Sequence, residues 1–301
     1  MVLTLAKQVV IMFILSGVGY LMFRTKKISA EGSKSIGNIL IYLSLPCVII
    51  RGFQVEQTPE TLQGLGLSAP LAAVILAVCI LIPRIIYKKD PIAAFAAGFS
   101  NPGFFGVPLI VSSLADGAVF YVAAYIAFLN LLQWTYGVAI MTGEKKGLSF
   151  KKVITAPFMI AIIIGLFFFL TGLKLPAMAD SVVSSIAALN TPLAMFTVGI
   201  YLAQTDILAM IKRYKLYGIS LVRLLVIPLV GLLLLSLVPA TQMDMKLALL
   251  IAAACPVGSN VAVYAQLHNK DYGYAVETVV ISTLFSVLTI PGIVWLAQQI
   301  W

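Results

Sequence analysis

Charged side chains are scarce in this sequence, at 10% of its 301 residues, whereas hydrophobic residues make up 61%. A typical soluble domain carries about 25% charged residues. The shortage of charge therefore excludes an ordinary soluble domain and indicates a chain that resides in a lipid bilayer.

Histidine and cysteine are also nearly absent. His268 is the only histidine, which excludes a metal site built from several histidines and leaves acid–base catalysis without its usual residue. Cys47, Cys79 and Cys255 lie in apolar stretches at unrelated spacings, so we expect buried thiols and no disulfide or metal site. Neither an HExxH nor a GxSxG motif occurs. We therefore expect no enzyme activity and no cofactor, with an intramembrane enzyme as a remote alternative.

What the chain has in abundance is apolar runs of about 20 residues, long enough to cross the hydrocarbon core of a bilayer. The first run ends in Arg24-Thr25-Lys26-Lys27 without a cleavage pattern, so it is expected to be a retained helix and not a signal peptide. We predict an all-α membrane protein with ten spans. They are expected at 4–24, 35–54, 67–87, 92–114, 117–142, 153–172, 181–204, 214–238, 246–268 and 273–298.

The net charge of +9 follows the predicted topology. Fifteen of the 20 lysines and arginines fall in alternate loops, four fall in the opposite loops, and Arg223 lies within a span. Because cytoplasmic loops are enriched in Lys and Arg, we expect a multi-pass inner (plasma) membrane protein with both termini on the non-cytoplasmic side. The charge predicts contact with lipid and not with nucleic acid. The fifteen are Arg24, Lys26, Lys27, Lys34, Arg84, Lys88, Lys89, Lys145, Lys146, Lys151, Lys152, Lys212, Arg213, Lys215 and Lys270, and the four are Lys7, Arg51, Lys174 and Lys246.

Two of the expected spans are interrupted at corresponding places in the two halves of the chain. One interruption contains Asn101-Pro102-Gly103, and the other contains Pro256-Val257-Gly258. Proline removes a backbone donor and glycine tolerates non-helical dihedral angles, so each span should unwind there. Unwound backbone cannot face lipid, and a matched pair of such breaks is the best sequence indication of a transporter's binding site.

The interruptions also indicate an internal duplication. Pro102 and Pro256 are 154 residues apart, and Asp116 and Asp271 are 155 apart, so the halves align with one gap. With five spans each, the second half must run opposite to the first across the bilayer. The predicted divisions of the single domain 1–301 are repeat one at about 4–142, a linker at 143–152 and repeat two at about 153–298.

Three sets of residues carry a family resemblance over the whole chain. They are the two broken-helix motifs, the prolines of Leu43-Ser44-Leu45-Pro46 and Leu189-Asn190-Thr191-Pro192, and the closing Ile281-Ser282-Thr283-Leu284-Phe285-Ser286-Val287-Leu288-Thr289-Ile290-Pro291. Together they resemble the auxin efflux carrier family, which includes the plant PIN-formed proteins and bacterial malate and malonate permeases. The chain lacks the long central loop of many plant members, which favours a compact prokaryotic type.

The resemblance implies a ten-helix 5+5 inverted repeat with crossing helices in spans four and nine, similar to bile acid sodium symporters and sodium–proton antiporters. It further implies a scaffold at about 4–54 and 153–204, through which a homodimer can form, and a transport domain at about 67–142 and 214–298. The transport domain would move past the scaffold in an elevator mechanism.

The interruptions supply the first candidate substrate-binding residues. We expect helices to restart after Gly103 and Gly258, with N-terminal N–H groups and positive dipole ends that favour an anion. Amide and hydroxyl groups stand at the same level, and the alternative is that they satisfy only the freed backbone. These residues are Asn101, Asn260, Ser100 and Ser259, while Pro102 and Pro256 are assigned as the breaks themselves.

Polar residues inside other spans complete the set. Asn130 and Gln133 share one face of span five, where they either bind substrate or join two helices. Arg223 and Glu277 are the ionisable groups within spans. We expect either a structural role, in which the two pair or Arg223 extends to the membrane interface, or a role in substrate binding or in coupling to a proton or sodium ion. Ser282, Thr283 and Ser286 line the site or bond to their own backbone.

These residues predict a secondary active transporter, either an exporter or a permease, for a small organic anion such as a carboxylate. The alternative on the same fold is a cation–proton antiporter or a sodium-coupled symporter. An antiporter typically needs aspartates at the crossing, where this chain has amides. A channel and a membrane sensor are less favoured, because the paired breaks imply an occluded site and no signalling domain is present.

Overall fold

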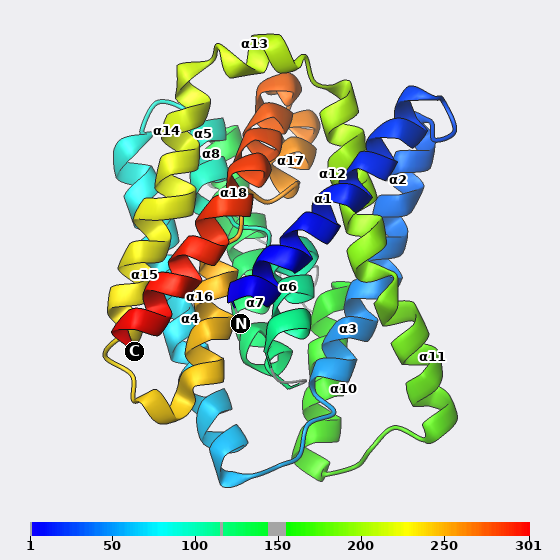
Figure 1. The fold of residues 1–301 in the computed structure, drawn as a ribbon, viewed down its shortest axis with the longest axis vertical. Helices are drawn as coiled ribbons and strands as arrows, with labels where there is room; N and C mark the ends of the chain where they lie inside the picture. The colour runs from blue at the N-terminus through cyan, green and yellow to red at the C-terminus, as the bar shows by residue number, and fades with distance from the viewer. Residues whose placement is uncertain (1, 115–116, 144–154) are drawn as a thin grey trace.

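The computed structural model describes residues 2–114, 117–143 and 155–301, and its regular elements in these ranges are all helices (Figure 1). Seven helical segments are long and apolar enough to cross a membrane. They are α1 (Val2–Arg24), α2–η1–α3 (Ala30–Ile39, Leu40–Ser44 and Leu45–Gly52), α4 (Pro59–Ile86), α7–η3–α8 (Val119–Leu132, Gln133–Gly137 and Val138–Thr142), α11–α12 (Ala177–Ala188 and Asn190–Gln204), α14–η4–α15 (Tyr214–Leu221, Val222–Val226 and Ile227–Leu235) and α18 (Tyr272–Ile300).

The remaining apolar segments are shorter or interrupted. Helix α10 has 15 residues, and two further segments each consist of a helix, a non-helical stretch and a second helix. The short elements α13 and η5 connect neighbouring segments. The bounds are α10 (Pro157–Thr171), α5 (Pro91–Gly98) with η2 (Pro102–Gly106) and α6 (Val107–Ser113), α16 (Met243–Ala254) with α17 (Asn260–Leu267), α13 (Ile207–Ile211) and η5 (Ala240–Gln242).

Two helices begin earlier than their apolar runs predicted. Helix α2 starts at Ala30 and not at 35, because the Ser29 side chain caps it by accepting from the Gly32 N–H. Helix α4 starts at Pro59 and not at 67, because Thr58 and Thr61 form a reciprocal capping box. Polar first turns are stabilised by caps and not by lipid, so hydrophobicity alone placed these starts too late.

Four membrane segments contain a π-helical turn, and three of these turns directly precede a proline. The turns end at Ser44, Gly106 and Val226, two residues before Pro46, Pro108 and Pro228. A proline cannot donate to the carbonyl four residues earlier and clashes with it, so a locally wider turn accommodates the ring. These turns matter for function because η2 and η3 carry residues of the site described below, and η4 carries Arg223.

The helices pack into two sets. Helix α3 contacts α10 and α11, and α12 contacts α1, α2 and α11; these helices lie on the right of Figure 1, with α1 running diagonally across the front. Helices α4, α5, α7, α14, α15, α16, α17 and α18 form the other network of contacts. Helix α13 joins α12 of the first set to α14 of the second.

Close packing of α1 against α12 depends on glycine. A Cβ atom on Gly199 would lie 1.9 Å from the Ser16 carbonyl oxygen, and one on Gly19 would lie 2.4 Å from that of Phe196. Backbone cannot yield as a flexible side chain can. The two helices therefore approach closely only because both positions lack a side chain.

We expect Gly199→Ala to lower the thermal stability of the purified protein, because overpacking costs about 1–3 kcal/mol. Gly17→Ala is the matched control in α1, since a Cβ there meets nothing within 4 Å and alanine favours a helix. Melting curves of the two variants in detergent provide the comparison. Equal melting temperatures would contradict the proposed close contact.

Candidate functional site

The two interruptions meet and satisfy each other's backbone. Helix α5 ends at Gly98 and α16 ends at Ala254, and beyond them Ser100 and Val257 form an antiparallel β-bridge. Asn101 N–H donates to the Pro256 carbonyl at 2.9 Å. The pairing supplies partners for groups that the breaks remove from helical bonding.

A reciprocal hydrogen bond and a nearby side chain complete this pairing. Gly258 N–H donates to the Phe99 carbonyl at 2.9 Å, and Val257 N–H donates to Ser282 Oγ at 3.0 Å. A Cβ atom on Gly258 would lie 2.8 Å from the Ser100 carbonyl oxygen. The close approach of the two strands of backbone therefore requires glycine at this position.

The helices resume near the predicted points but not at them. The first restarts at Pro102 and not after Gly103, because Asn101 caps it by accepting from the Phe104 N–H at 3.3 Å and proline suits the first helical position. The second restarts at Asn260, two residues beyond Gly258. Both new N-termini face the same space.

That space is a cavity of about 550 Å³ between the interruptions and helices of both sets. Every residue that the sequence assigned to substrate binding lines it. These residues are Ser100, Asn101, Gly103, Asn130, Gln133, Gly258, Ser259 and Asn260.

Hydrogen bonds already engage part of the polar lining. Asn260 Nδ2 donates to Gln133 Oε1 at 2.7 Å, so the second interruption is tied to η3. Asn130 Nδ2 donates to the carbonyl of Ile126 on its own helix at 2.8 Å. The Ser100 hydroxyl lies 3.3 Å from the Tyr125 hydroxyl.

Two buried polar atoms of the lining have no hydrogen-bond partner in the described part of the chain. They are Gln133 Nε2, on a residue that is 1% exposed, and the hydroxyl of Tyr264, which is 4% exposed. Buried donors without partners are costly. A ligand that accepts hydrogen bonds would remove this cost for both groups.

No Lys, Arg, His, Asp or Glu occurs among the described residues that line the cavity. A charged ligand here would therefore be recognised by backbone N–H groups, amides and hydroxyls. The positive ends of the helices that begin at Pro102 and Asn260 favour an anion.

Arg223 does not pair with Glu277, contrary to one sequence expectation. Arg223 is fully buried, and its guanidinium donates to the carbonyls of Ala97, Gly98 and Ala253. It does not reach the surface either, so the alternative of a side chain extending to the interface is also wrong. The sequence placed the two charges at similar depth but could not show which way each helix face turns.

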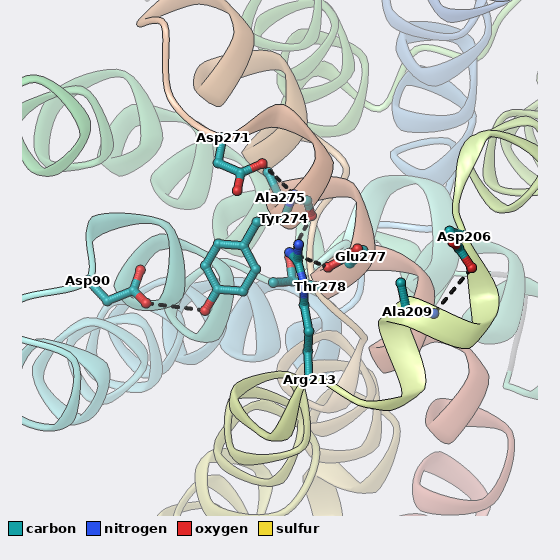
Figure 2. Close-up of polar contacts among 9 residues, drawn as sticks. All are labelled: Asp90, Asp206, Ala209, Arg213, Asp271, Tyr274, Ala275, Glu277 and Thr278. Atoms are coloured by element: carbon teal, nitrogen blue, oxygen red, sulfur yellow. Dashed lines mark hydrogen bonds and ion pairs between the residues drawn. The ribbon is translucent and has the colours of Figure 1, made fainter.

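Glu277 instead forms an ion pair with Arg213, at 2.8 Å (Figure 2). Tyr274 on the same helix donates its hydroxyl hydrogen to Asp90, and Asp271 caps the helix by accepting from the Tyr274 N–H. Asp271 thus stands at the start of α18 as its cap, whereas Asp116, its counterpart in the repeat, lies outside the described residues. Glu277 does not line the cavity.

Comparison with known proteins adds a family. A family model described as "Membrane transport protein" matches residues 4–294. The chain belongs to this membrane transport protein family. The match confirms the resemblance to auxin efflux carriers and points to transport rather than catalysis.

One curated relative is named "Putative malonate transporter", from Rhizobium meliloti (strain 1021). It is 25% identical over 302 residues, which cover 94% of this chain and 92% of the relative. The similarity therefore extends over nearly the full length of both proteins.

In this membrane transport protein, sequence reasoning missed the aromatic part of the cavity. Tyr264 and Trp134 line it with ring centroids 5.6 Å apart, and Phe104 lines it beside the first interruption. Tyr264 stands one helical turn after Asn260, which was the available signal, since residues four apart share a face.

The hydroxyl groups of predicted span ten lie outside the cavity of this membrane transport protein. Ser282, Thr283 and Ser286 donate to carbonyls of their own helix and do not line the cavity. Cys79 and Cys255 are buried free thiols, as expected, whereas the free thiol Cys47 is only partly buried. Asn190 reaches across from α12, and its Nδ2 donates to the Gly103 carbonyl at 3.2 Å.

Proposed function

We propose that this protein is a secondary active transporter that carries a small carboxylate, such as malonate, across the membrane. The observation that supports this most is the cavity itself, which combines two helix N-termini with unpartnered donors and no charged side chain among its described lining residues. The name of the relative from Rhizobium meliloti supports the same substrate class.

Charge matching favours one ionised carboxylate group at the helix ends, which is one of the two that malonate carries at neutral pH. Each helix N-terminus is equivalent to roughly +0.5 of an elementary charge, so two together balance about one negative charge. Gln133 Nε2 and the Tyr264 hydroxyl would donate to the carboxylate oxygens. The apolar walls, including Phe104 and Trp134, would surround the carbon skeleton.

The proposed architecture is the 5+5 inverted repeat, with ten spans and the two interrupted segments crossing at mid-membrane. The antiparallel bridge between Ser100 and Val257 supports it, because oppositely directed halves bring their interruptions together antiparallel. The contact networks support a scaffold of α1–α3 and α10–α12 and a transport domain of the remaining long elements, joined through α13.

Alternating access is supported by a second cavity of about 560 Å³. Its lining includes Arg51, Glu56 and Asp180, near loops assigned to the non-cytoplasmic side, whereas the first cavity includes Pro157 and Leu267, near basic loops. Asn190 lines the second cavity and bonds to Gly103 in the first. We infer that the substrate site opens towards the cytoplasm in this conformation. The second cavity would then belong to the route from the non-cytoplasmic side.

A cation–proton antiporter on the same fold is the second proposal to test. The absence of a carboxylate among the described lining residues disfavours it. An antiporter would change the pH inside vesicles on cation addition without any organic solute. A sodium-coupled symporter would instead require Na⁺ together with the carboxylate.

Reconstituted protein should take up radiolabelled malonate, and purified protein should melt at a higher temperature with malonate than with the neutral analogue malonamide. Asn101→Ala and Asn260→Ala should each lower uptake about tenfold, because each removes a polar contact at the site. Gln266→Ala on the exposed face of α17 is the matched control. Unchanged uptake in both asparagine variants would contradict the site, and stabilisation by no carboxylate would contradict the substrate class.

A further inference from the structure

Arg223 lies at the C-terminal ends of α5 and α16, the helices that precede the two interruptions. It belongs to the π-helical turn η4, and its guanidinium contacts the last turn of α5 and of α16. Nη1 donates to the carbonyls of Ala97 and Gly98, each at 3.2 Å, and Nη2 donates to that of Ala253. The residue is not among those that line the cavity.

This arginine has no carboxylate partner in the described ranges, although it is 0% exposed. A buried charge without compensation is strongly unfavourable. Here the compensation comes from two helix C-termini, each equivalent to roughly −0.5 of an elementary charge. Together they balance about one positive charge, which is the charge of one guanidinium.

The position matters because freed carbonyls at the C-terminal ends of interrupted helices are where transporters coordinate a coupling cation. In this chain those carbonyls are already bound. We propose that Arg223 is a built-in cation that takes the place of a coupling ion, holds the two interruptions together, and makes transport independent of Na⁺. The independence from Na⁺ rests on the proposed function, whereas the role of Arg223 in holding the two interruptions together does not.

Arg223 is thus a positioning residue. It acts on the cavity through the chain that continues from Gly98 to Asn101 and from Ala253 to Asn260. If it is removed, three carbonyls face an empty space of guanidinium size, where a small free cation can bind in its place.

The test uses Arg223→Ala with guanidinium chloride, NaCl or choline chloride at millimolar concentration. Melting temperature without substrate is the first readout, and malonate uptake into proteoliposomes is the second. Guanidinium should raise the melting temperature of Arg223→Ala but not of the wild type. Uptake by the variant should fall about tenfold and recover in part with guanidinium, because the free cation can donate to the three carbonyls that Arg223 leaves.

Arg213→Ala is the control for loss of an arginine, and guanidinium should not restore any change that it causes. Wild-type uptake should be the same in NaCl and in choline chloride. The proposal is overturned if wild-type uptake requires Na⁺, if Arg223→Ala behaves as the wild type, or if no cation stabilises Arg223→Ala.

Should Arg223→Ala yield no folded protein, Arg223→Lys and Arg223→Met replace it. Lysine keeps the charge and should yield folded protein, whereas methionine, of similar length, should not. Equal yields would overturn the proposal. A wild-type protein that moves no carboxylate would contradict the proposed function alone, because the guanidinium effect on melting temperature is measured without substrate.

Discussion

Gln133→Glu should abolish carboxylate uptake, with a loss of about 100-fold or more. The substitution is nearly isosteric and keeps an oxygen that accepts from Asn260 Nδ2. It replaces the unpartnered Nε2 donor with a negatively charged oxygen inside a buried cavity. The two helix N-termini balance about one negative charge, so a carboxylate at position 133 would use that charge itself and would repel the substrate.

Uptake of radiolabelled malonate in proteoliposomes, measured together with melting temperature, gives the comparison. Gln266→Glu is the matched control, because it adds the same charge on the exposed face of α17 and should leave uptake unchanged. Gln133→Met tests the donor without a charge and should reduce uptake less. Normal malonate uptake by folded Gln133→Glu would remove this cavity as the anion site.

Gly258→Ala should reduce uptake about 100-fold by separating the two interruptions. The new Cβ would lie 2.8 Å from the Ser100 carbonyl oxygen and 3.3 Å from that of Phe99. Since both neighbours are backbone, the bond from Gly258 N–H to Phe99 must lengthen or break. Both the backbone pairing and the start of α17 would shift, and a 1 Å displacement of a site can cost about 100-fold.

Gly292→Ala in α18 is the control, because a Cβ atom at this position would meet nothing within 4 Å. Uptake and malonate-dependent stabilisation should both be normal in that variant. Gly258→Ala should lose both while remaining folded by circular dichroism. Retention of malonate stabilisation in Gly258→Ala would show that the backbone pairing does not shape the site.

The sequence could single out the polar residues around the interruptions because their chemistry is local. Proline and glycine at 101–103 and 256–258 interrupt helices wherever those helices lie, and buried interruptions need partners. Asn130 and Gln133 were identified because polar side chains are costly in an apolar span. Their arrival around one cavity with both interruptions agrees with that interpretation.

The partners of the charged residues could not be predicted in the same way. Arg223 and Glu277 were expected at equal depth, yet Arg223 binds carbonyls and Glu277 binds Arg213. Depth follows from position along a helix, whereas partner choice depends on how each helix is rotated and which neighbours it meets. Tyr264 differs, because its spacing of four residues from Asn260 placed it on the same helix face.

By itself, the sequence determined that the chain is an all-helical membrane protein with two interrupted segments that carry amides and hydroxyls. Apolar runs, prolines and glycines dictate this through backbone hydrogen bonding in lipid, which acts within each segment. Only the tertiary structure decided that the interruptions pair with each other, that their N-termini share a cavity with Gln133, and that Arg223 binds their C-terminal ends. Most of those contacts join residues more than 100 positions apart, and the packing of whole helices selects them.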